Sequence, residues 1–109
     1  MIKSAKRAAP DPVPPLVVGD VRYEVIHFGR REGLDQNGGY IVAKTDKTGE
    51  VLWTLKVYDV VYDPNGKEGD SQDVFITTMR KMWFRPKLWI ADELGRRFVV
   101  DLNSKTVSP

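Results

Sequence analysis

The chain has 109 residues, 41% of them hydrophobic and 29% charged, with a formal net charge of +2 and no cysteine. This length fits one small domain, and the composition is typical of a globular protein rather than a disordered chain. The lack of cysteine excludes disulfides, thiolate catalysis and cysteine-based zinc sites. A net charge of +2 does not by itself indicate a nucleic-acid ligand.

The first fifteen residues predict a flexible arm, and residues 16–109 a single β domain. Residues 1–15 combine basic and small residues with four prolines. Proline donates no backbone hydrogen bond and biases its neighbour towards extended conformations. The basic residues near the start are not followed by an apolar segment, and no run is long enough to span a bilayer. We therefore expect a cytoplasmic protein without a signal peptide and without a membrane partner.

Period-two alternation begins after Asp20, where Val21, Tyr23 and Val25 alternate with charged residues. This pattern predicts a strand with one face in water. Residues 29–38 are polar and glycine-rich, which predicts a loop.

Residues 39–58 predict one antiparallel hairpin. An apolar run at 40–43 is followed by a turn at 46–49 and by an alternating run that contains Trp53. The apolar pattern continues to Tyr62, but Asp59 interrupts the core-facing positions. Because a buried unpaired carboxylate is costly, we expect a bulge or bend near Tyr58 and Asp59.

The second half of the chain also predicts strands. Residues 73–84 contain several β-branched side chains, which favour strand over helix. Residues 87–91 and 97–102 predict a last hairpin. The sequence Asp-x-x-Gly, which is typical of type I turns, occurs three times, at 46–49, 63–66 and 92–95.

Together these elements predict an all-β fold. We expect a single antiparallel meander of about six strands, in a curved sheet or closed into a small barrel or sandwich. The predicted core consists of Val21, Tyr23, Val25, Ile41, Trp53, Leu55, Val57, Phe98 and Val100.

The hairpin sequence Thr48-Gly49-Glu50-Val51-Leu52-Trp53 resembles the blade signature of quinoprotein-type β-propellers. A propeller needs at least four blades, and this chain is too short for four. We therefore do not expect the cofactor chemistry of the quinoprotein family here, and we expect no cofactor. A wider resemblance links the chain to a family of small uncharacterised bacterial proteins without an assigned activity. The resemblance implies an autonomous all-β domain. It is carried by residues 39–41, 48–53, 56–58, 62–64, 73–77 and 100–102.

Two features could indicate a functional site, namely His27 and the acidic loop from Asp63, but a structural role explains each of them better. His27 is the only histidine, and no nucleophile or orienting partner lies near it in sequence. The acidic loop from Asp63 begins like a calcium-binding loop, but Lys67 and Glu68 break the required register. We therefore interpret it as a solvated loop and assign no catalytic, cofactor-binding or metal residue. The oxygen-bearing residues of this loop are Asp63, Asn65, Glu68, Asp70 and Asp73.

A third candidate is a basic and aromatic patch. Aromatic platforms flanked by cations bind single-stranded nucleic acid through stacking and phosphate contacts. On a β sheet, however, we expect Trp83 and Trp89 to pack inward while the cations face water. The patch consists of Arg80, Lys81, Trp83, Arg85, Lys87, Arg96 and Arg97.

The sequence leaves three functional hypotheses. The first is a non-enzymatic module that binds a protein partner or a second copy of itself through a sheet edge or an aromatic face. The second is single-stranded nucleic-acid binding by the patch. The third is a ligand carrier or enzyme with a pocket in the curved sheet, and a deep pocket that holds His27 beside a carboxylate would support it.

Overall fold

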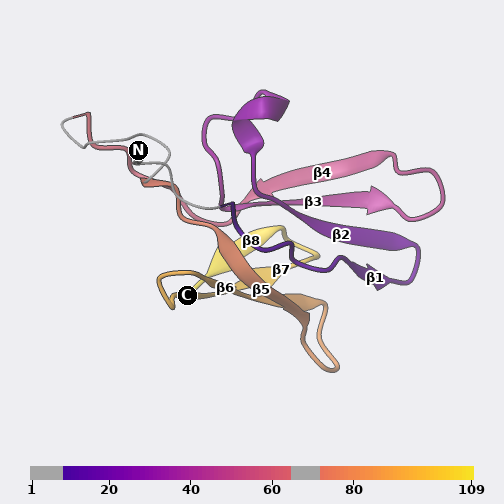
Figure 1. Ribbon diagram of the computed structural model, residues 1–109. Helices are drawn as coiled ribbons and strands as arrows, with labels where there is room; N and C mark the ends of the chain where they lie inside the picture. Colours follow the sequence, from indigo (N-terminus) through magenta and orange to yellow (C-terminus); the bar gives the residue numbers. More distant parts are fainter. Residues whose placement is uncertain (1–8, 65–71) are drawn as a thin grey trace.

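The computed structural model describes residues 9–64 and 72–109, and within them the chain forms two four-stranded sheets (Figure 1). Each sheet is an antiparallel meander in chain order. Sheet A contains β1 (Leu16–Val18), β2 (Val21–Ile26), β3 (Tyr40–Thr45) and β4 (Val51–Lys56). Sheet B contains β5 (Ile76–Lys81), β6 (Lys87–Asp92), β7 (Arg97–Asp101) and β8 (Thr106–Ser108). The all-β antiparallel prediction is confirmed, whereas a single meander of about six strands is wrong.

The division into two sheets occurs after β4. The chain bends at Tyr58, as predicted, but it does not continue as a strand to Tyr62. Gln36 supplies the physical reason, because its amide nitrogen donates to the carbonyl of Tyr58 at 2.9 Å and its amide oxygen accepts from the Val60 N–H at 2.8 Å. The carbonyl of Tyr58 and the N–H of Val60 are thus hydrogen-bonded to a buried side chain and not to a neighbouring strand. Asp59 is exposed, so no carboxylate is buried at this point.

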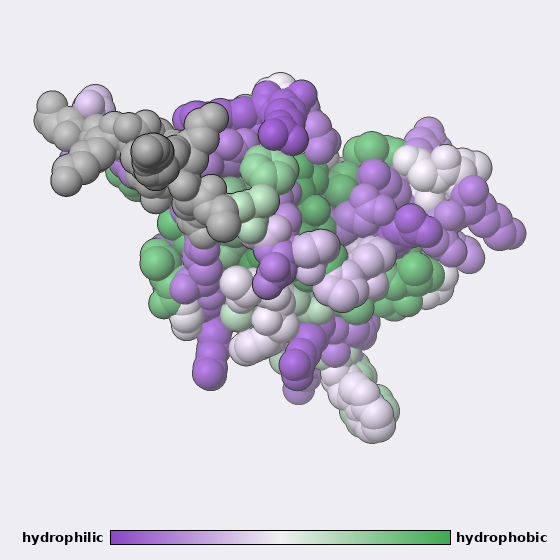
Figure 2. Space-filling model, in the orientation of Figure 1, coloured by the Kyte–Doolittle hydropathy of each residue, from purple (hydrophilic) through white to green (hydrophobic). Residues whose placement is uncertain are grey.

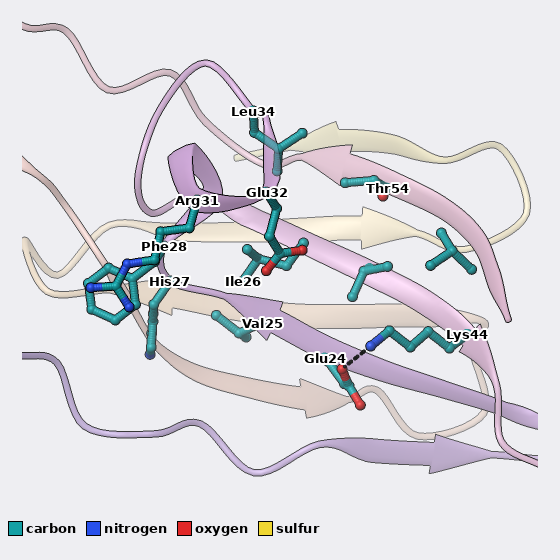
Figure 3. A pocket seen from close by; sticks show the side chains of 12 residues that line it. Glu24, Val25, Ile26, His27, Phe28, Arg31, Glu32, Leu34, Lys44 and Thr54 are labelled. Carbon is teal, nitrogen blue, oxygen red and sulfur yellow. Dashed lines mark hydrogen bonds and ion pairs between the residues drawn. The ribbon is translucent and has the colours of Figure 1, made fainter. Parts of the chain in front are cut away.

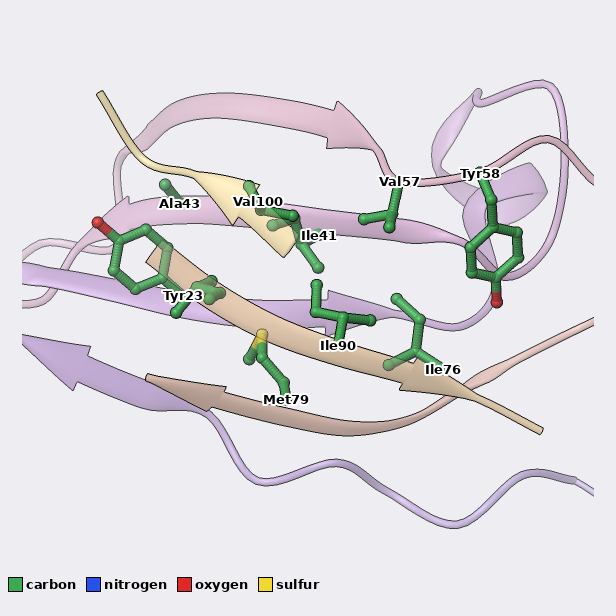
Figure 4. Close-up of a cluster of buried hydrophobic side chains, with 10 residues drawn as sticks. Tyr23, Ile41, Ala43, Val57, Tyr58, Ile76, Met79, Ile90 and Val100 are labelled. Atoms are coloured by element: carbon green, nitrogen blue, oxygen red, sulfur yellow. The ribbon is translucent and has the colours of Figure 1, made fainter. Parts of the chain in front are cut away.

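The core lies between the two sheets, and Figure 4 shows side chains of both pointing into it. Alternate positions along each strand face inward, as the period of a β-strand requires. Of the predicted core, Tyr23, Ile41, Val57 and Val100 are buried, and the other five pack against them while partly exposed. The prediction omitted the sheet B half of the core, which includes Ile76, Met79, Leu88 and Ile90.

Two of the three predicted turns lie within the described residues. In the turn at 92–95, Asp92 accepts hydrogen bonds from the N–H groups of Leu94 and Arg96 at 3.0 and 2.9 Å. In the turn at 46–49 the backbone N–H of Glu50 donates to the Thr45 hydroxyl instead. The turn predicted at 63–66 extends outside the described residues.

A short 3₁₀ helix, η1 (Gly29–Glu32), lies within the predicted polar loop. Leu34, which follows it, packs on a second apolar cluster of Ile26, Tyr40 and Val42. No helix in residues 9–64 or 72–109 is long and apolar enough to cross a membrane. Part of the predicted arm is also described, and there Val13 packs against the core.

Burial raises the pKa of all four tyrosines above the ordinary value of 10.0. Burial and a hydrogen bond to Asp73 raise the pKa of Tyr62 to about 12. We therefore expect the native protein to show little phenolate absorbance at pH 10, where an unfolded chain is half ionised. Because the pKa values of these tyrosines are higher in the folded protein than in the unfolded chain, keeping them neutral favours the folded state. This stabilising effect is complete below pH 10 and is lost as the pH rises towards 12. A half-developed phenolate signal at pH 10 in folded protein would contradict the burial described.

Candidate interaction surface

The end of the β5–β6 hairpin projects from the body of the molecule (Figures 1 and 2). Trp83 and Phe84 lie in this turn with 83% and 93% of their surface exposed. Their rings contact each other edge to face, with centroids 5.1 Å apart. Two large aromatic side chains are thus held together in water, away from the core.

The turn is ordered by its own hydrogen bonds. The N–H of Met82 donates to the carbonyl of Lys87 at 2.9 Å, and the ammonium group of Lys81 donates to the carbonyls of Met82 and Arg85. Phe84 has φ +61°, in the left-handed region that glycine favours. Such a conformation costs about 1–2 kcal/mol for a residue other than glycine. The fold therefore tolerates both strain and apolar exposure at this tip.

Sheet B also presents an outer face whose described side chains are exposed or partly buried. Trp89 lies on this face, because its neighbours Leu88 and Ile90 point into the core. Its cross-strand partners are Arg80 on β5 and Val99 on β7. The guanidinium group of Arg97 lies 5.8 Å from the centre of the Trp89 ring. We call this arrangement, Arg80, Trp89, Arg97 and Val99, the arginine–tryptophan face.

The structure divides the predicted patch into three places. Arg80, Lys87 and Arg97 lie on the outer face of sheet B, where Lys87 is the cross-strand neighbour of Asp101. Trp83 and Arg85 belong to the tip. The remaining two cations are engaged elsewhere: Lys81 binds carbonyls of the turn, and Arg96 forms an ion pair of 2.6 Å with Asp92 and lies over the rings of Tyr58 and Phe98.

The expectation that Trp83 and Trp89 pack inward is wrong for both. Trp83 stands at the tip, and Trp89 alternates with two buried residues on the same strand. For Trp89 the sequence contains the signal, because its neighbours Leu88 and Ile90 are both apolar. In a strand either Trp89 or the pair Leu88 and Ile90 faces the core, but not both.

The charges of the two halves differ in sign. Residues 72–109 contain seven basic and four acidic residues, whereas residues 9–64 contain six basic and nine acidic residues. The acidic residues of the basic half all accept hydrogen bonds within the protein. These acceptors are Asp73, Asp92, Glu93 and Asp101. In the described ranges Arg80, Arg85 and Arg97 form no ion pair, so sheet B presents a positive surface.

Sheet A carries a cleft of about 430 Å³ on its outer face, beside η1 (Figure 3). Val42 and Leu34 line it, and the ion pair between Lys44 and Glu24, 2.9 Å long, lies along one side. This hydrogen bond to Lys44 lowers the pKa of the Glu24 carboxyl.

His27 also lines the cleft, but within residues 9–64 and 72–109 no hydrogen bond or ion pair joins it to a carboxylate there. Its Nε2 atom lies 3.0 Å from the carbonyl oxygen of Asp11, and its ring contacts Phe75 edge to face. Among the described residues no group of three or more acidic or histidine side chains is placed to hold a metal ion. Of the predicted acidic loop, residues 65–71, including Asn65, Glu68 and Asp70, lie outside the described residues.

The fold and its surfaces define a class: a two-sheet antiparallel β protein with an exposed aromatic tip and a basic sheet face. No protein-family model, characterised protein or solved structure matches the chain. Function must therefore be argued from these surfaces.

Proposed function

We propose that this protein is a non-enzymatic interaction module that binds a protein partner through its β5–β6 tip. The observation that supports this most is the exposure of Trp83 and Phe84 on a turn in which Phe84 adopts a left-handed conformation. Burying each ring in a partner would contribute about 1.5–3 kcal/mol. Tryptophan and arginine are also the residues most enriched in binding hot spots, and Arg85 follows the pair directly.

The rigidity of the turn supports the same proposal. A hairpin held by backbone hydrogen bonds and by Lys81 loses little conformational entropy when it binds. An aromatic pair on such a turn can enter a pocket of the partner without refolding.

Pairing through a sheet edge is less well supported. Among the described strands β4 pairs with β3 alone, so its other edge is open. However, the β3–β4 ladder is irregular next to Ala43, and Lys56 stands at the end of β4. Irregular ladders and lysines on edge strands are features by which proteins prevent edge-to-edge association.

The test is a double substitution, Trp83→Ser with Phe84→Ser, compared with Leu94→Ser as the control. Leu94 is also an exposed apolar residue, with 63% of its surface exposed, but it lies in the β6–β7 turn. We expect beads carrying the wild type or the control to retain a stoichiometric protein from nuclease-treated cell extract, and the double variant to lose it. Equal retention by all three proteins, or retention by none, would overturn the proposal.

The double variant should remain folded. Both side chains are almost fully exposed, and changes at such positions usually alter the free energy of unfolding by no more than about 0.5 kcal/mol each. Urea denaturation followed by circular dichroism checks this expectation. A loss of several kcal/mol would mean that the tip packs against the protein, and the two aromatic residues would then be structural.

A further inference from the structure

The arginine–tryptophan face is a second surface that the proposed function does not use. It lies on the outer side of sheet B, whereas the aromatic pair stands in the turn at the end of β5 and β6. Arg80 and Arg97 of this face are exposed, and Val99 is partly buried. Trp89 is only partly buried there.

The geometry of this face combines a ring with two cations. Arg80 is the direct cross-strand neighbour of Trp89 on one side, and Arg97 approaches the same ring from β7. Neither guanidinium has a carboxylate within ion-pair distance in the described ranges. Asp101, two residues beyond Val99 on β7, accepts hydrogen bonds from the backbone N–H groups of Asn103 and Ser104.

We infer that this face binds single-stranded nucleic acid, with one base stacked on Trp89 and the neighbouring phosphates held by Arg80 and Arg97. A single strand offers a ring face and regularly spaced negative charges, and both are matched by this arrangement. An acidic peptide would satisfy the arginines but would leave the indole without a stacking partner. A duplex keeps its bases stacked internally, so it could not use Trp89.

The test measures binding of a fluorescent oligothymidylate of about 15 nucleotides by anisotropy at low ionic strength. Wild-type protein should bind with an affinity that decreases with salt, because phosphate contacts release counterions. Trp89→Leu should weaken binding by about 5-fold to 100-fold, since one stacked base is lost. Arg80→Gln combined with Arg97→Gln should reduce the slope of log K against log salt by about 1.4, because about 0.7 is lost per phosphate contact.

Control variants separate this inference from the proposed function. Arg22→Gln removes a cation from sheet A and should leave oligonucleotide binding unchanged. The Trp83→Ser/Phe84→Ser variant should lose the protein partner but retain oligonucleotide binding. Because Arg80 and Arg97 are exposed, their double variant should fold even if Trp89→Leu does not.

Three outcomes would overturn the inference. The first is no binding of the wild type at low ionic strength. The second is equal affinity for a DNA duplex of the same length or for polyglutamate, which would indicate a general polyanion surface. The third is unchanged affinity in the Arg80→Gln/Arg97→Gln variant.

Discussion

Replacing Leu88 with alanine should lower the free energy of unfolding by about 2–5 kcal/mol. Leu88 is 0% exposed and belongs to the core between the sheets, with Val100 opposite it on β7. The substitution removes three carbon atoms from a closely packed core, and the surrounding side chains can fill the cavity only in part. For a domain of this size such a loss is a large fraction of the total stability.

Leu94→Ala provides the matched control, because it makes the same chemical change at a position with 63% exposure. We expect it to alter the free energy of unfolding by no more than about 0.5 kcal/mol. Urea denaturation of both variants measures the difference. Similar losses at the two positions would show that β6 does not face the core as described.

Replacing Gly38 with alanine should cost about 2–5 kcal/mol, from two sources. Gly38 has φ +79°, which costs other residues about 1–2 kcal/mol. A Cβ atom there would also lie 2.2 Å from the carbonyl oxygen of Val74, so the backbone must move. Displacements that relieve such overpacking typically cost about 1–3 kcal/mol.

Gly49→Ala separates these two sources. Gly49 has nearly the same φ, +77°, but a Cβ atom there meets nothing within 4 Å. Its substitution should cost only the conformational part, about 1–2 kcal/mol. If denaturation shows equal losses for the two variants, the start of β3 is not held against the segment that leads into β5.

The two long hairpins could be predicted from the sequence because their signals are local. Alternation around Trp53 and around Ile90 defines strands, and each hairpin has a turn with glycine at positive φ, Gly49 in one and Gly95 in the other. The separation into two sheets could not be predicted in this way. It depends on Gln36, whose amide occupies backbone groups of Tyr58 and Val60 more than twenty positions away.

The candidate surface was only partly predictable, for a similar reason. Sequence proximity grouped Arg96 with Arg97, but Arg96 precedes β7 and forms an ion pair with Asp92, and only Arg97 reaches Trp89. Hydrophobicity argued for burial of Trp83. β5 ends at Lys81 instead, and Phe84 has φ +61°, so both Trp83 and Phe84 lie in the turn.

The proposed function depends on the exposure of the β5–β6 tip in solution, which the fluorescence of the three tryptophans can measure. Three variants that each keep one tryptophan, with phenylalanine at the other two positions, would be compared by acrylamide quenching of fluorescence. The protein that keeps Trp83 should be quenched most strongly, because Trp53 and Trp89 are both partly buried. Quenching of Trp83 no stronger than that of Trp53 would show that the tip is covered, and would contradict the proposed binding surface.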